Sequence, residues 1–236
     1  ASGINFTLHF LSFRNINIKP YLNDAELHAY LKILIVICIV CSCYNAIAGN
    51  YESLSGVFRD SIFQTVSIAT TTGFTTANFQ NWPGFIPLLL IFSCFIGACA
   101  GSTCGGIKVI RILLLFKQGI REIKRLIHPN AIFTIKIGDK PISERIIEAV
   151  WGFLAVYVII FAILLLALMA TDIDFLTAFS ALSACINNLG PGLGEVSQNY
   201  YGINAIAKWI LCLAMLLGRL EIFTLLVLFT PAFWQR

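Results

Sequence analysis

Two glycine-centred stretches contain the residues of this chain whose type and spacing suggest chemistry. They occupy residues 70–74 (TTTGF) and 187–191 (NNLGP), and their glycines are 117 residues apart. Glycine adopts backbone angles that side chains resist, so the chain around it can turn consecutive carbonyl oxygens toward one axis. Carbonyls arranged in this way replace the hydration shell of a monovalent cation. The candidate ion ligands are the carbonyl groups of Thr71, Thr72, Gly73, Phe74, Asn188, Leu189, Gly190 and Pro191.

The apolar segments before these two stretches are too short to cross a bilayer. Residues 58–69 and 175–186 each form a helical segment of about 12 residues, which is about 18 Å long or roughly half a bilayer. A chain that enters so far must return, and irregular backbone at that depth is tolerated only inside protein or beside water. Ordinary turns are the alternative for each stretch alone. Their recurrence after two half-length helices favours two filter loops of a pore.

The composition is that of an integral membrane protein. Hydrophobic residues make up 58% of the chain and charged residues only 12%, whereas globular proteins have roughly a quarter charged. The mean hydropathy is +0.84. We expect an all-α fold of two tandem repeats, each a span, a re-entrant pore helix, a filter loop and a second span, as in potassium channels. The four full spans are expected at residues 33–49, 85–107, 150–170 and 203–230.

Charge and turn signals divide the chain around these repeats. Asp60 and Asp174 are placed to cap the two half-length helices. Residues 138–141 (GDKP) predict a turn within a basic stretch, which the positive-inside rule puts in the cytoplasm. The expected divisions are a cytoplasmic connector from a preceding repeat at 1–32, one repeat at 33–120, a basic cytoplasmic linker at 121–145 and a second repeat at 146–236.

A glycine-rich stretch interrupts the expected second span. Each glycine destabilises a helix by about 1 kcal/mol relative to alanine, so residues 97–106 (GACAGSTCGG) are expected to unwind into an intramembrane loop. The alternative is close helix packing of the Gly-x-x-x-Gly kind, which this stretch also satisfies. The candidate gate residues are Gly97, Gly101, Ser102, Thr103, Gly105, Gly106 and, from the last span, Arg219.

Arg219 is the charge expected to lie deepest in the membrane, near the middle of the last span. A charge at that depth is unfavourable and indicates a function by default. We expect it to act as an electrostatic gate beside Ser102, which precedes it by the repeat offset of 117 residues. A structural pair with Glu221 or with a backbone carbonyl is the alternative. Residues two apart on a helix diverge, which weakens Glu221 as the partner.

No set of residues indicates an enzyme. The three histidines lie in stretches expected to be cytoplasmic, without a matching nucleophile, and no phosphate-binding glycine motif is present. The basic stretch is explained by span orientation, so nucleic acid is not expected as a partner. No cofactor is expected, and K+ enters only as the transported ion at the filter carbonyls.

Four motifs together resemble the Trk/Ktr/HKT superfamily of potassium transporters, and in particular its third and fourth repeats. They are residues 70–76 (TTTGFTT), 101–108 (GSTCGGIK), 187–192 (NNLGPG) and 218–221 (GRLE). The resemblance implies four repeats around one pore, potassium uptake across the bacterial inner membrane, and a gate formed by the loop and the arginine. It also implies a homodimer and a cytosolic, nucleotide-binding regulatory subunit of the TrkA type.

Only two of the four repeats that the resemblance implies are expected in this chain. It is therefore predicted to be the C-terminal half of a pore, which requires the missing N-terminal repeats and the lipid bilayer to function. A sodium-permeable relative and a non-transporting membrane scaffold or assembly subunit remain the alternative functions.

Overall fold

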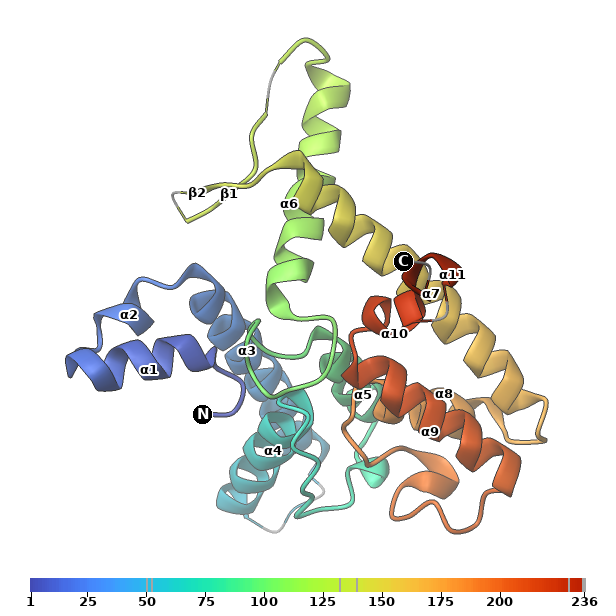
Figure 1. Ribbon diagram of the computed structural model, residues 1–236. Helices are drawn as coiled ribbons and strands as arrows, with labels where there is room; N and C mark the ends of the chain where they lie inside the picture. Colours follow the sequence, from blue (N-terminus) through green and yellow to red (C-terminus); the bar gives the residue numbers. More distant parts are fainter. Residues whose placement is uncertain (50, 52, 132, 139, 229, 235–236) are drawn as a thin grey trace.

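The computed structural model is mostly helical and describes residues 1–49, 51, 53–131, 133–138, 140–228 and 230–234 (Figure 1). Two short 3-10 turns, η1 (Phe79–Asn81) and η2 (Gly194–Val196), lie beyond the candidate filter loops. The helices are α1 (Phe6–Asn15), α2 (Lys19–Leu22), α3 (Ala25–Ala48), α4 (Leu54–Ala69), α5 (Ile86–Ile96), α6 (Val109–Ile127), α7 (Glu144–Met169), α8 (Phe175–Ile186), α9 (Ala205–Arg219), α10 (Phe223–Leu228) and α11 (Pro231–Trp234). The strands are β1 (Lys136–Ile137) and β2 (Lys140–Pro141).

Two described helices, α3 and α7, are long and apolar enough to cross a membrane by length and composition. The other two expected spans are not continuous helices: residues 85–107 break where the loop was predicted, and residues 203–230 also break, after Arg219, where no break was predicted. Helix α5 ends at Ile96, and the chain stays irregular until α6 begins at Val109. Glycines at positive φ end α5, with Gly97 at 66° and Gly101 at 70°. A helix cannot continue through that backbone.

The first unit is built on the packing of α3 against α4 and of α4 against α5. Helix α4 begins at Leu54 and has 16 residues, so it is longer than the expected segment 58–69. The prediction that Asp60 caps this helix is wrong, because Asp60 lies within it. Ser53 is the cap, and its hydroxyl accepts a hydrogen bond from the Gly56 amide at 3.3 Å. A serine side chain here satisfies an amide that the first turn leaves unpaired.

The second unit places α8 at the centre of a hydrophobic core. Helix α8 contacts α5, α7 and α9, and 9 of its 12 residues are buried. The prediction that Asp174 caps this helix is confirmed, since its carboxylate accepts a hydrogen bond from the Thr177 amide at 3.1 Å. Helix α9 ends at Arg219, and the next turn holds Glu221 and Ile222 at φ values of 53° and 52°.

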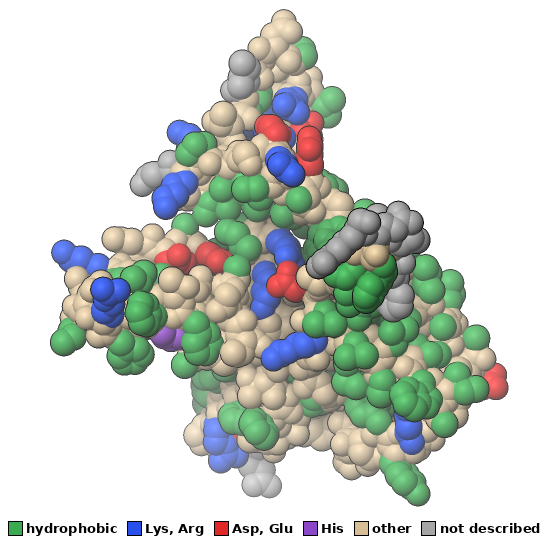
Figure 2. Space-filling model, viewed as in Figure 1, with side chains coloured by type: hydrophobic (Ala, Val, Ile, Leu, Met, Phe, Trp, Pro, Cys, Tyr) green, Lys and Arg blue, Asp and Glu red, His purple; other side chains and the backbone are tan. Residues whose placement is uncertain are grey.

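Helix α6 contacts α3 and α7, and its far end projects with the β1–β2 hairpin beyond the other helices (Figure 1). Lys136 pairs with Pro141 and Ile137 with Lys140, so the turn predicted at 138–141 is present, although Asp139 lies outside the described residues. Charged side chains gather over α6, whereas hydrophobic side chains cover much of the face over α9 (Figure 2). This contrast follows the sequence, in which the charges are concentrated between the two apolar halves.

Candidate functional site

The two candidate filter loops leave their helices through the same backbone hydrogen bonds. After α4, the amide of Thr71 donates to the carbonyl of Ile68 at 3.0 Å, and the amide of Thr72 donates to Ser67 at 2.8 Å. After α8, the amides 117 residues later repeat both bonds, from Asn188 to Cys185 at 3.0 Å and from Leu189 to Ala184 at 2.8 Å.

The backbone of both loops enters the left-handed region at equivalent positions. Thr71 has a φ of 49° and Asn188 a φ of 54°, while Gly73 and Gly190 have φ values of 82° and 106°. Asparagine tolerates such angles, but a β-branched threonine does so only where the surrounding structure holds it. The two loops therefore share a strained conformation that is typical of functional sites.

Most of the carbonyl groups predicted to bind an ion have no protein partner. Within the described residues, no hydrogen bond reaches six of the eight predicted carbonyls, those of Thr71, Thr72, Gly73, Asn188, Leu189 and Pro191. Thr72 is exposed and Thr71, Gly73 and Asn188 are half-buried, so these unpaired carbonyls are open to a ligand or to water. Two other predicted ligands are engaged: Phe74 accepts from the Ser67 hydroxyl and Gly190 accepts from the Tyr200 hydroxyl, both at 2.6 Å.

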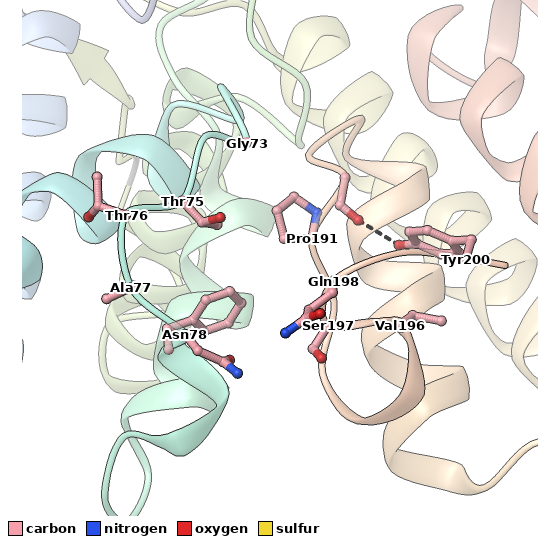
Figure 3. A pocket seen from close by; sticks show the side chains of 12 residues that line it. Gly73, Thr75, Thr76, Ala77, Asn78, Pro191, Val196, Ser197, Gln198 and Tyr200 are labelled. Atoms are coloured by element: carbon pink, nitrogen blue, oxygen red, sulfur yellow. Dashed lines mark hydrogen bonds between the residues drawn. The ribbon is translucent and has the colours of Figure 1, made fainter. Parts of the chain in front are cut away.

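The two loops meet where Gly73 of the first approaches Leu189 of the second. A Cβ atom at Gly73 would collide with the carbonyl oxygen of Leu189, so only glycine allows this approach. On their other side the loops line a cavity of about 610 Å³, shown in Figure 3. The dashed line in that view is the hydrogen bond that ties Tyr200 to the second loop.

The glycine-rich loop, residues 97–106, contacts both filter loops. The Gly105 amide donates to the Thr71 hydroxyl at 2.9 Å, and a Cβ atom at Gly105 would collide with the carbonyl oxygen of Asn187. The unwinding predicted for this stretch is present, and the alternative of continuous helix packing is not. The residues predicted as a gate therefore lie directly against the residues predicted as a filter.

Arg219 reaches the glycine-rich loop from the end of α9. Its Nη1 donates to the carbonyl oxygen of Thr103 at 3.1 Å, and it lines a small cavity of about 140 Å³ together with Ser102 and Thr103. Arg219 is exposed in this chain and stands at the break between α9 and α10, inside the expected last span, and its depth near the middle of that span stays a prediction. The Ser102 hydroxyl is buried and has no hydrogen-bond partner within the described part of the chain.

Glu221 is not the partner of Arg219 in the structure. It pairs with Arg111, whose Nη2 lies 2.6 Å from the Glu221 carboxylate, and the Arg111 guanidinium also lies 4.2 Å from the ring centre of Phe153. This pair joins the first turn of α6 to the turn after α9. It fixes the two segments that flank the small cavity at Arg219.

The electrostatic field at the filter loops favours a cation. The C-terminal ends of α4 and α8, at Ala69 and Ile186, run directly into the loops and carry partial negative charge. At the opposite end of α8, hydrogen bonds from Thr177 hold the pKa of the Asp174 carboxyl below its usual value. Its negative charge is favourable at a helix N-terminus.

Sequence analysis missed the carboxylate that holds the glycine-rich loop in place. Glu26 is buried on α3, and its Oε1 accepts hydrogen bonds from the amides of Ala100 at 2.7 Å and Ile110 at 3.2 Å. Lys108 was also missed; its Nζ donates to the carbonyl of Cys104. A carboxylate at the start of an apolar run was the signal that could have identified Glu26.

Comparison with known proteins gives one consistent result over the whole chain. The family model described as "TrkH: Cation transport protein" matches residues 1–236. The chain is 52% identical to a Trk system potassium uptake protein TrkH from Vibrio parahaemolyticus and 50% identical to one from Escherichia coli, over 99% of this chain in each case. The crystal structure of the potassium transporter TrkH from Vibrio parahaemolyticus matches 99% of this chain with a TM-score of 0.94 and 52% identity.

The chain spans about half the length of the relatives that it matches. The alignments cover 49% of the Vibrio protein, 48% of the Escherichia protein and 50% of the chain in the crystal structure. The described fold thus corresponds to one half of a larger transporter.

Proposed function

Because the chain belongs to the TrkH family of cation transport proteins, we propose that it forms half of the pore of a potassium uptake protein. K+ passes down its electrochemical gradient between the two filter loops, where backbone carbonyls replace part of its hydration shell. The residues proposed as ligands are the free carbonyls of Thr71, Thr72, Gly73, Asn188 and Leu189. Phe74, Gly190 and Pro191 complete the two loops.

The observation that carries this proposal is the matched pair of loops. Two segments 117 residues apart share their helix-ending hydrogen bonds, their left-handed residues and their glycines, and they touch each other at Gly73 and Leu189. A single loop of this kind is a turn. Two in contact, each with unpartnered carbonyls at the end of a helix, support a shared ion path.

The outer flanks of the two loops support the proposal that further repeats complete the pore. A Cβ atom at Gly190 would have no neighbour within 4 Å, and the Phe74 side chain is 71% exposed. A cavity of about 490 Å³ lies beside Gly190, and one of about 480 Å³ lies beside Phe74. We assign these flanks to contacts with the two repeats that the relatives contain in addition.

We assign the gate to the glycine-rich loop and Arg219. The loop lies against both filter loops through Gly105, and the hydrogen bond from Arg219 to Thr103 holds it there. A guanidinium beside the path also repels cations. Displacement of the loop, with Gly97, Gly101 and Gly106 at positive φ as its flexible points, opens the path.

The names of the relatives support one part of the proposed setting. They belong to a "Trk system", which indicates more than one component. We propose a bacterial inner-membrane location, a homodimer, and a cytosolic nucleotide-binding regulatory subunit of the TrkA type. Helices α3 and α7 supply two membrane spans.

The test is ion flux through the full-length protein carrying Gly73→Ala or Gly190→Ala. Both glycines are at positive φ, so alanine strains the loop and K+ uptake falls. Gly152→Ala is the control, since a Cβ atom there meets nothing within 4 Å and φ is ordinary. Unchanged uptake in a folded variant overturns the filter and favours a scaffold. Equal K+ and Na+ flux in the parent protein favours the sodium-permeable alternative.

A further inference from the structure

A basic cavity lies between α6 and the segment that leads into the hairpin. It has a volume of about 440 Å³. The described residues that line it include four cations and no carboxylate. The cations are Lys117, Arg121, Lys124 and Lys136, and Phe133 and Thr134 lie opposite α6. Glu144 pairs with Arg121, so the three lysines are the charges that repel one another around this small cavity, and a bound anion relieves that repulsion.

Arg121 is the fixed point of this cavity. Its side chain is only 4% exposed, and Nη1 and Nη2 donate to both carboxylate oxygens of Glu144, the first residue of α7. Its Nε is buried and has no hydrogen-bond partner. The nearest carboxylate oxygen, from Glu122, is 3.7 Å from Nε and already accepts from Gln118 and Arg125. Because Nε is buried and both Nη atoms already donate to Glu144, Arg121 shapes the wall of the cavity, and the three lysines supply its charged donors.

The position of the cavity relative to the bilayer indicates which source of anions lies beside it. Helix α7 has 26 residues and is about 39 Å long, which exceeds a hydrocarbon core of about 30 Å. Its first residue, Glu144, therefore lies in the headgroup layer, and Arg121 is bonded to it. Along α6, Arg121 is about 18 Å from Val109, the first residue of that helix. This distance gives the height of Arg121 above the bilayer centre on one premise, taken from the proposed function: the glycine-rich loop before α6 lies at that centre.

An apolar surface adjoins the cavity on its membrane side. Ile120 lines the cavity and is 39% exposed, and Phe116, one turn closer to the glycine-rich loop, is 68% exposed. An anion with an apolar tail satisfies both features, with its phosphate among the cations and its tail on Phe116. A free phosphate satisfies only the first. Figure 2 shows charged and hydrophobic side chains side by side over α6 and the hairpin.

We propose that this cavity binds the phosphate group of an anionic phospholipid from the cytoplasmic leaflet. The ammonium groups of Lys117, Lys124 and Lys136 donate to the phosphate oxygens, and Lys117 also donates to the backbone carbonyl of Lys136. The Arg121–Glu144 pair fixes the guanidinium in the cavity wall, so the site between α6 and residues 133–136 is anchored to α7.

The test measures phosphatidylglycerol retained by the purified full-length protein, using native mass spectrometry. The variant is Lys117→Gln with Lys124→Gln, which keeps Arg121 and its contact with α7. Retention weakens about 30-fold, because each lysine near an anionic headgroup contributes about a fivefold gain. The control is Arg14→Gln with Lys19→Gln, which removes two exposed cations from the opening helices and leaves retention unchanged.

The outcomes separate the two sources of phosphate. Competition by inorganic phosphate, lost in the same variant, shows that the site recognises phosphate in either form and supports it. Equal losses in variant and control, or no loss in either, overturn the proposal. So does retention of neither phosphatidylglycerol nor phosphate, which leaves an acidic protein surface as the occupant. Flux through the Gly73 variant tests the pore separately, so failure of one proposal is distinguishable from failure of the other.

Discussion

Replacing Glu26 by glutamine is expected to release the glycine-rich loop. The Glu26 carboxylate accepts the amides of Ala100, inside the loop, and Ile110, just after it. Hydrogen bonds to a charged group contribute about 1.5–3 kcal/mol, and neutral ones about 1 kcal/mol. Two bonds weakened by about 1 kcal/mol each destabilise the closed loop by about 2 kcal/mol, which changes its closed-to-open ratio roughly 30-fold.

Two measurements read out this change in the full-length protein. K+ flux into proteoliposomes rises if the loop is the gate. The rate of maleimide labelling at Cys99 and Cys104, which are 0% and 6% exposed, rises if the loop has moved. Glu148→Gln is the matched control, because Glu148 is exposed on α7.

The two readouts distinguish the loop from the gate. Faster labelling with unchanged flux shows that Glu26 holds the loop but that the loop does not limit ion passage. Unchanged labelling in folded protein refutes the reasoning from the two hydrogen bonds. Lower flux with faster labelling refutes the gate, since it makes the closed position the conducting one.

Three further variants test individual contacts. Arg219→Ala removes the hydrogen bond to Thr103 and raises K+ flux, while Arg219→Lys keeps the charge and raises it less; loss of folded protein in both favours a structural role instead. Arg111→Gln and Glu221→Gln are combined in a double-mutant cycle that measures the free energy of thermal unfolding. The expected coupling energy is about 1 kcal/mol or less, because the Glu221 side chain is half exposed, and strictly additive effects contradict the pair. Asp174→Ala destabilises α8 by about 1 kcal/mol in chemical unfolding. Since the folded-state pKa of Asp174 is lowered, its contribution is present above the unfolded pKa and is lost as pH falls through the folded value, and an identical acid profile in the variant argues against it.

Local signals in the sequence were sufficient where the cause of the structure is local. The glycines at 97–106 predict unwinding because a glycine-rich helix is intrinsically weak, and α5 does end at Ile96. Asp174 predicts a cap because its side chain reaches an amide three residues later. The cap of α4 was misassigned because Asp60 and Ser53 both suit that role, and the extent of the apolar run did not distinguish them.

Contacts between distant segments could not be derived from the sequence. Glu26 meets the glycine-rich loop 74 residues away, and Arg111 meets Glu221 at a separation of 110 residues. Such pairs depend on how the two units pack, which periodicity and propensity do not encode. The roles of the filter and gate residues stay predictions, although the structure brings the two sets into contact through Gly105.

The two units differ at equivalent positions, since residues 97–106 form a loop and the chain up to Arg219 is helical, and this difference has a physical reason. The carbonyl groups inside a helix accept hydrogen bonds from that helix's own amides, so they are not available to an arginine side chain from another segment. Residues 97–106 are not helical, and the Thr103 carbonyl is therefore free to accept from Arg219. If both units carried an arginine here, two like charges would lie beside one proposed path. If both units were unwound here, neither loop would have a guanidinium to donate a hydrogen bond to its carbonyl groups. The Thr103 carbonyl and the Arg219 guanidinium satisfy each other in the structure. We propose that this asymmetry within the repeat, with a loop in one unit and an arginine in the other, provides the closed state.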